Sequence, residues 1–150
     1  MLARALAAFL LLASALPARS ESRIEMFYLG TPDCRYCQHW EARARQELLA
    51  SPEGKAIRYV EIRGETLRQP IAAHHYPPEY RWVYDQIGPS RGVPRFLLAV
   101  DGRITVSVLG TGGYNEIFLP ALRATLASRA STPGRASIPK GGVHVQAHAS

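Results

Sequence analysis

Residues 31–40 read TPDCRYCQHW and contain both cysteines of the chain, Cys34 and Cys37. An apolar run precedes this stretch, and residues with helical spacing follow it. In a helix that starts at Cys34, Cys37 lies on the same face one turn later, near enough for the two sulfurs to form a disulfide. Backbone N–H groups without helical partners and the positive end of the helix dipole favour a thiolate at Cys34. We therefore expect Cys34 to be an exposed nucleophile and Cys37 to be the resolving thiol of the mixed disulfide.

Two other roles for a lone C-x-x-C pair compete with the redox role. The pair forms half of many zinc sites, but a closed site needs a second cysteine pair or suitably spaced histidines. A structural disulfide across so short a loop would remove little entropy from the unfolded chain. The redox role is favoured, and we expect no metal and no cofactor other than a redox-active disulfide between Cys34 and Cys37.

The composition indicates one ordinary domain with dispensable ends. The chain has 150 residues, of which 47% are hydrophobic and 20% charged, and its formal net charge is +6. The basic residues are spread along the whole sequence, and no Lys/Arg run alternates with aromatic residues as a nucleic-acid groove would require. We therefore expect no nucleic-acid partner. The positive charge is expected to affect solubility and encounters with acidic clients.

The two ends of the sequence differ from its middle. Residues 1–18 begin with one arginine, continue as an apolar run and end in small residues, which is typical of a secretory signal peptide. The run is shorter than the ~20 residues that span a bilayer, so no stable membrane insertion is expected after cleavage. Export implies a periplasmic or secreted protein. Residues 130–150 are rich in Pro, Gly, Ala and Ser and are predicted to be a disordered tail, which leaves a domain at residues 23–129.

Hydrophobic patterning predicts alternating strands and helices. Residues 24–29 are nearly all apolar, as in a central strand, and residues 57–62 alternate, as in a strand nearer an edge. The helix after Cys34 would join them in a right-handed βαβ unit. Residues 64–78 are irregular, and the adjacent histidines in this loop are expected to be solvent-exposed, although they could also hold a metal or contact a client. Ser51 is predicted to be the N-cap of a short turn that has Pro52 at its first helical position. Residues 79–87 fit a short helix.

The sequence pattern in the last third of the domain predicts a hairpin followed by a helix. Two β-rich runs, within residues 91–100 and 103–108, are joined by Asp101-Gly102, which is a strong hairpin signal. Pro94 stands at the head of the first strand, where proline is tolerated. Asn115 is expected to cap the last helix, and Pro120 to delay or kink its start.

The chain resembles the thioredoxin superfamily over residues 23–129 on two motifs: the C-x-x-C pair that opens a helix after an apolar strand, and Gly92-Val93-Pro94 before the hairpin and the final helix. The resemblance implies an α/β, thioredoxin-like fold. Its central four-stranded mixed sheet has the order 2-1-3-4, with the third strand antiparallel to its neighbour and helices on both faces. It further implies that the Val93–Pro94 bond is cis and lies against the two sulfurs. Val93 and Pro94 would then contact the substrate, because an extended client segment could pair with the Val93 backbone while the proline ring covers the thiolate.

Three features of the sequence depart from thioredoxins proper. Tyr28 stands six residues before the first cysteine, where thioredoxins have a buried aspartate. The dipeptide between the cysteines is Arg35-Tyr36 instead of Gly-Pro, and its tyrosine is similar to that of glutaredoxins. Arg35 is expected to favour the thiolate and Asp33 to oppose it. Arg95 follows the proline where threonine is common, and either adds positive potential to the client groove or points to solvent. Asp33, Arg35, Tyr36 and Arg95 are therefore the expected environment of the cysteines.

The leading hypothesis is an exported, monomeric thiol–disulfide oxidoreductase that acts on protein clients and needs a redox partner to supply or accept electrons. A reductase or a client-specific maturation factor is slightly favoured, since no second domain or dimerisation segment is visible. One alternative is a periplasmic Cu/Zn-binding chaperone of thioredoxin-like fold, using Cys34 and Cys37 with His39, His74 or His75. Another is a redox-silent binding module that has kept the fold.

Overall fold

The computed structural model describes residues 22–131, so the predicted signal peptide at residues 1–18 lies outside the described part. Most of the predicted tail lies outside it as well. The last helix ends at Ala130, one residue into the segment predicted to be disordered. None of the helices between residues 22 and 131 has the length and apolar character that crossing a membrane requires.

Four strands form a mixed sheet in the order β2-β1-β3-β4. They are β1 (Ile24–Gly30), β2 (Arg58–Arg63), β3 (Arg95–Val100) and β4 (Arg103–Leu109). β1 runs parallel to β2 and antiparallel to β3, and β3 is antiparallel to β4. Every residue of β1 is buried, while β2 alternates. The predicted α/β fold, strand order and direction of the third strand are confirmed.

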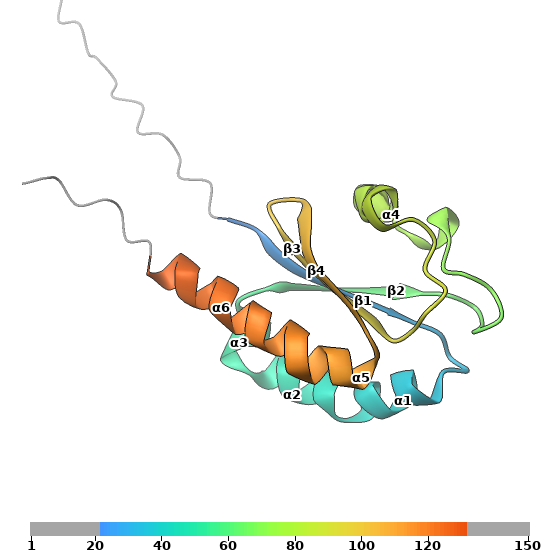
Figure 1. Ribbon diagram of the computed structural model, residues 1–150, viewed down its shortest axis with the longest axis horizontal. Helices are drawn as coiled ribbons and strands as arrows, with labels where there is room; N and C mark the ends of the chain where they lie inside the picture. Colours follow the sequence, from blue (N-terminus) through green and yellow to red (C-terminus); the bar gives the residue numbers. More distant parts are fainter. Residues whose placement is uncertain (1–21, 132–150) are drawn as a thin grey trace, which may run out of the picture.

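Helices cover both faces of the sheet (Figure 1). The first helical segments and the C-terminal helix lie on one face, and α4 lies on the other. The α-helices are α1 (Arg35–Ala42), α2 (Ala44–Ala50), α3 (Pro52–Lys55), α4 (Arg81–Ile87), α5 (Gly110–Gly113) and α6 (Leu119–Ala130). Short 3₁₀ turns stand at η1 (Ala73–His75) and η2 (Pro78–Tyr80), and a π-helical turn at η3 (Tyr114–Phe118).

Each face of the sheet has its own hydrophobic core. We call the one under α1 and α6 the cysteine-side core, because it contains both cysteines; its aromatic members are Tyr28, Trp40, Phe96, Tyr114 and Phe118. Their rings pack directly, with centroids 4.5 Å apart for Tyr28–Trp40 and 4.8 Å for Trp40–Phe96. The α4-side core contains Phe27, Leu29, Val60, Ile62, Ile71, Tyr76, Tyr80, Val83, Leu97 and Ala99. Alternation along β1 and β3 therefore sends successive side chains to different cores.

The segment after the cysteines is two helices rather than one. α1 ends at Ala42 and α2 begins at Ala44, because Arg43 between them leaves helical geometry at φ −127° and ψ −74°. Neither proline nor glycine stands at this break. The predicted cap at Ser51 is confirmed, since its Oγ accepts a hydrogen bond from the Gly54 N–H at 3.1 Å and Pro52 occupies the first helical position.

The hairpin is confirmed, but the predicted cap at Asn115 was wrong. Asp101 and Gly102 both have positive φ, 51° and 77°, as the expected tight turn requires. After β4 the chain enters helical geometry at Gly110, well before Asn115. It then widens into the π-helical turn η3 just before Pro120. Pro120 has no N–H to donate to the preceding turn, which explains why regular helical bonding is interrupted there.

Candidate active site

The cysteine pair stands at the end of the central strand. β1 ends at Gly30, and a turn follows in which the Cys34 N–H donates to the Thr31 carbonyl at 3.2 Å. Cys34 is the N-cap of α1, and a disulfide joins it to Cys37 in the first turn. The turn is also held from the helix, because Gln38 Nε2 donates to the Pro32 carbonyl at 2.6 Å.

The sulfur of Cys34 faces a backbone N–H in the first turn of α1. It accepts a hydrogen bond from the Cys37 N–H at 3.1 Å, in the way that a hydroxyl or carboxylate caps other helices. A backbone donor at a helix start favours negative charge on the atom that it faces, which is why a thiolate is expected at Cys34 in the reduced protein. The local geometry thus supports the predicted order of reactivity, with Cys34 ahead of Cys37.

The prediction of an exposed Cys34 was wrong for this disulfide form. Cys34 is 2% exposed and Cys37 is fully buried. The capping position turns the Cys34 sulfur back over the first turn, towards the Cys37 N–H and the Cys37 sulfur, instead of outwards. Val93 packs against the core to which both cysteines belong.

Val93 and Pro94 lie at the same end of the sheet as the cysteines. Arg95, the first residue of β3, pairs with Leu29 near the end of β1, so Pro94 stands beside the point where β1 gives way to the cysteine turn. The Val93–Pro94 peptide bond is cis, as the resemblance implies. The Pro94 carbonyl accepts from the Gly110 N–H at 2.8 Å, which ties this turn to the end of β4.

Asp33, the residue before the nucleophile, is bonded to a distant loop. Its carboxylate accepts from Thr66 Oγ at 2.6 Å and from the Leu67 N–H at 2.9 Å. The hydrogen bond from Thr66 is the main cause that lowers the pKa of Asp33 below its ordinary value. We call this contact the Asp33 latch. Asp33 is therefore an anion at neutral pH, as expected beside Cys34, but its charge is partly satisfied by the loop after β2.

Of the other three residues expected around the cysteines, Arg35 and Tyr36 lie beside them and Arg95 does not. Arg35 and Tyr36 are exposed on the first turn of α1, with Tyr36 69% exposed beside the buried pair. The Arg95 guanidinium instead donates to Ser107 Oγ at 2.9 Å and to Ser90 Oγ at 3.3 Å. Phe96 belongs to the cysteine-side core, so strand alternation places Arg95 on the α4 side. The structure does not bring its charge to the cysteines.

Tyr28 stands where thioredoxins have a buried aspartate, and it contacts a carboxylate on α1, that of Glu41. Its buried hydroxyl donates to Glu41 Oε1 at 2.5 Å, and Arg63 Nη1 donates to the same oxygen at 2.7 Å. Burial acts to raise the pKa of Glu41, but these two hydrogen bonds outweigh it and hold the pKa below its ordinary value. Burial and the neighbouring Glu41 strongly raise the pKa of Tyr28. Glu41 lies one turn after Cys37 on α1, and Arg63 pairs with its carboxylate.

The histidines named in the metal-chaperone hypothesis do not join the cysteines. Within residues 22–131, the group whose donor atoms could reach one metal ion is Glu65, His74 and His75, which includes neither cysteine. His39 is exposed on α1. Sequence reasoning missed Glu65, Thr66 and Glu41, since each meets its partner through tertiary folding and carries no local motif.

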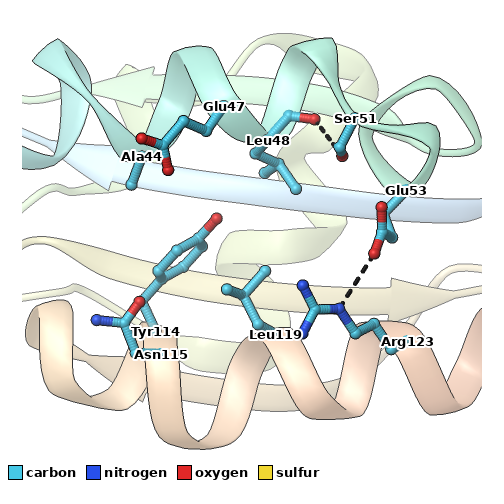
Figure 2. Close-up of a pocket in the computed structure, with 9 residues that line it drawn as sticks. All are labelled: Ala44, Glu47, Leu48, Ser51, Glu53, Tyr114, Asn115, Leu119 and Arg123. Carbon is cyan, nitrogen blue, oxygen red and sulfur yellow. Dashed lines mark hydrogen bonds and ion pairs between the residues drawn. The ribbon is translucent and has the colours of Figure 1, made fainter.

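A cleft on the cysteine side of the sheet is separate from the cysteines (Figure 2). It lies between α2 and the C-terminal helices, and Tyr114 points across it towards α2. An ion pair between Glu53 and Arg123, with 3.1 Å from Oε1 to Nε, links α3 to α6 at one end. Neither the cysteines nor Val93 and Pro94 line the cleft, so it is not part of the redox site.

Comparison with known proteins gives structural likeness but no sequence match. No protein-family model matches the chain, and no curated protein is detectably similar to it. Among solved structures, the chain is similar to the reduced periplasmic thioredoxin SoxS from Paracoccus pantotrophus, with 22% identity, coverage of 72% of this chain and 99% of that chain, and a TM-score of 0.48. It is also similar to a Malassezia sympodialis thioredoxin, Mala s 13 (14% identity, 68% and 76% coverage, TM-score 0.46). A third similar structure is Chlamydomonas reinhardtii thioredoxin f2 (14%, 77% and 86%, TM-score 0.42).

The fold follows from the chain's own geometry. The sheet has the order β2-β1-β3-β4, and the cysteine disulfide stands where β1 leads into α1. The Val93–Pro94 bond precedes β3 at the same end of the sheet. An α/β sheet of this order with a C-x-x-C disulfide at that position is what the resemblance implies, and the domain accordingly has the fold of the thioredoxin superfamily.

Proposed function

We propose that this chain is a thiol–disulfide oxidoreductase that exchanges disulfides with protein clients through Cys34 and Cys37. The observation that carries the proposal is the Cys34–Cys37 disulfide at the start of α1, with the Cys37 N–H donating to the Cys34 sulfur. A structural disulfide of this span would contribute little stability, whereas thiolate stabilisation at one sulfur is what exchange chemistry needs.

The exchange has two balanced steps. In the reducing direction, the Cys34 thiolate attacks one sulfur of a client disulfide, forms a mixed disulfide and releases the other client sulfur as a thiolate. Cys37 then loses its proton and attacks the Cys34 sulfur, which forms the Cys34–Cys37 disulfide and releases the second client thiolate. The client gains two electrons and this protein loses two. The oxidising direction is the reverse.

Val93 and Pro94 are proposed to position the client. They stand at the cysteine end of the sheet, and Val93 is only partly buried. An extended client segment could pair there with the Val93 backbone, as in other cases of strand addition. Exposed Tyr36 provides an aromatic surface beside the disulfide.

The finer assignments complete the proposal. We place the protein in the periplasm or outside the cell, as a monomer whose disulfide exchange needs no metal and no cofactor other than the Cys34–Cys37 disulfide. We favour a reductase or client-specific maturation factor that depends on a separate redox partner. A reduction potential of about −120 mV, typical of a strong oxidant, would contradict the reductase assignment.

Client-disulfide turnover by the reduced, full-length chain tests the function. Wild-type protein should reduce a protein disulfide such as that of insulin, and Cys34→Ser should abolish turnover. Cys37→Ala should accumulate a mixed disulfide that reducing agent releases. His39→Ala changes an exposed residue of the same helix and serves as the matched control, with turnover unchanged. Equal turnover by Cys34→Ser and wild type would favour the redox-silent binding module instead.

A further inference from the structure

The loop between β2 and α4 gathers three metal-ligand side chains away from the cysteines. His75 Nε2 lies 2.6 Å from Glu65 Oε2, and His74 Nε2 lies 3.9 Å from Glu65 Oε1. The two imidazole rings are 3.9 Å apart between centroids. One donor atom from each residue falls within 4.8 Å of the other two. Tetrahedral ligand atoms about 2 Å from a common ion are about 3.3 Å apart, so side-chain rotations that widen the Glu65–His75 contact and draw His74 closer would bring all three to one metal.

His75 is fixed in a way that suits a metal ligand. Its side chain is 5% exposed, although it was predicted to be a solvent-exposed loop residue. Its Nδ1 lies 3.0 Å from the Ala72 N–H and 3.1 Å from the Ala72 carbonyl. With the proton on Nε2, Nδ1 accepts from the N–H and Nε2 donates to Glu65. With the proton on Nδ1, it donates to the carbonyl and leaves the Nε2 lone pair free, which is the usual backbone support of metal-bound histidine.

The other two candidate ligands, Glu65 and His74, are much more exposed than His75, and Glu65 adds a carboxylate. Their side chains are 62% and 71% exposed, so both can rotate without disturbing the core. Glu65 contributes a carboxylate whose two oxygens face the two imidazoles, Oε2 towards His75 and Oε1 towards His74. Histidine nitrogens with one carboxylate form an N/O donor set that suits Zn²⁺ and related divalent transition metals, with water completing the coordination.

We propose that Glu65, His74 and His75 bind a divalent transition-metal cation, with Zn²⁺ as the probe ion. Binding takes the place of the Glu65–His75 hydrogen bond: the imidazole proton moves from Nε2 to Nδ1, and Nε2 and the carboxylate turn to the metal. The site needs neither thiol and is available while Cys34 and Cys37 form their disulfide. It lies beside the Asp33 latch, since Thr66 and Leu67 directly follow Glu65.

Calorimetric titration of the oxidised full-length chain with Zn²⁺ tests the site. The disulfide keeps the thiols out of the reaction, and a His144→Ala/His148→Ala background removes the histidines near the C-terminus. We expect one Zn²⁺ per chain, and a loss of affinity of about 10- to 100-fold in Glu65→Gln and in His74→Ala. Both positions are exposed, so neither change threatens folding. His39→Ala, the matched control, should bind as the background protein does. Absence of stoichiometric binding, or unchanged affinity in both Glu65→Gln and His74→Ala, overturns the proposal.

The tautomer of His75 gives an independent readout. Long-range ¹H–¹⁵N NMR spectra distinguish a proton on Nε2 from one on Nδ1. The His75 ring should carry its proton on Nε2 without metal and on Nδ1 after Zn²⁺ is added. A His75 signal that stays in the Nε2–H form at saturating Zn²⁺ would show that the metal binds elsewhere and would contradict the site.

Discussion

The two faces of the sheet differ in chemistry although the same two central strands supply both. On the cysteine side, stacked aromatic rings lie under the disulfide, with Trp40 in the helix that carries both cysteines. On the α4 side, aliphatic residues mixed with Phe27, Tyr76 and Tyr80 lie beneath a polar loop, and that loop reaches Asp33 and carries Glu65 and His75. One face of the sheet therefore holds the cysteine pair, while a loop that continues from the edge strand β2 contacts the carboxylate of Asp33 beside it.

Removing one ring from each face should give the largest effects. Phe96 and Phe27 are both fully buried in the central strands but belong to opposite cores. Each change to alanine should lower the free energy of unfolding by about 3–5 kcal/mol, measured by urea denaturation. Only Phe96→Ala should also shift the equilibrium of the disulfide with glutathione, because its core includes both cysteines. An equal shift in Phe27→Ala would contradict the division of roles between the faces.

A second pair of changes compares a buried hydroxyl that is bonded with one that is not. The Tyr28 hydroxyl donates to Glu41, whereas the buried Tyr76 hydroxyl has no hydrogen-bond partner among the described residues. Tyr28→Phe should cost about 1.5–3 kcal/mol, the usual contribution of a hydrogen bond to a charged group. Tyr76→Phe on the α4 side should be neutral or stabilising. Thermal or urea unfolding of both variants measures the difference, and a costlier Tyr76→Phe would reverse the expected order.

The smallest effect is expected at the Asp33 latch. Asp33→Asn removes a negative charge beside Cys34, which should favour the thiolate and raise the reduction potential by less than about 30 mV, a tenfold change in equilibrium constant. The neutral amide of this variant cannot accept from Thr66 and Leu67 as an anion does, so the charge-dependent part of the latch is also lost. Thr66→Ala weakens the latch but keeps the charge. The reduction potential of the cysteine pair in Thr66→Ala should therefore fall or stay constant. A rise equal to that in Asp33→Asn would show that loop geometry, and not the Asp33 charge, sets the potential.

The latch also predicts a pH dependence with a definite sign. The pKa of Asp33 is lowered in the folded protein from the ordinary value of 3.8, mainly by the Thr66 hydrogen bond. The unfolded chain therefore binds the proton more readily, so the stabilisation is fully present above pH 3.8 and is lost as the pH falls through the lowered folded value. The stability difference between wild type and Asp33→Asn should be constant near neutral pH and shrink in acid. A difference that grows in acid would contradict this sign.

Local signals in the sequence were sufficient for several elements of this structure. The Asp101-Gly102 turn and the Ser51 cap depend on neighbouring residues, and both were predicted correctly. The sheet order came from the resemblance, which combines the C-x-x-C pair with the Gly-Val-Pro motif. These features are visible because turn and cap chemistry acts within a few residues.

Contacts between distant segments were not predictable in the same way. The Asp33 latch joins residues 33 positions apart, and Glu65 meets His75 through an irregular loop. The burial of Cys34 depends on the direction in which the capping sulfur turns, which residue types do not specify. Likewise, nothing in the composition of the helix marked the break at Arg43. Each of these features follows from tertiary packing.

The most direct test of the redox assignment is the equilibrium of the Cys34–Cys37 disulfide with defined ratios of reduced and oxidised glutathione, followed by quantification of free thiols. A redox-active pair should titrate reversibly as a two-electron couple, with a midpoint between about −270 and −120 mV. A disulfide that stays fully oxidised below about −300 mV would behave as structural disulfides do and would contradict the account.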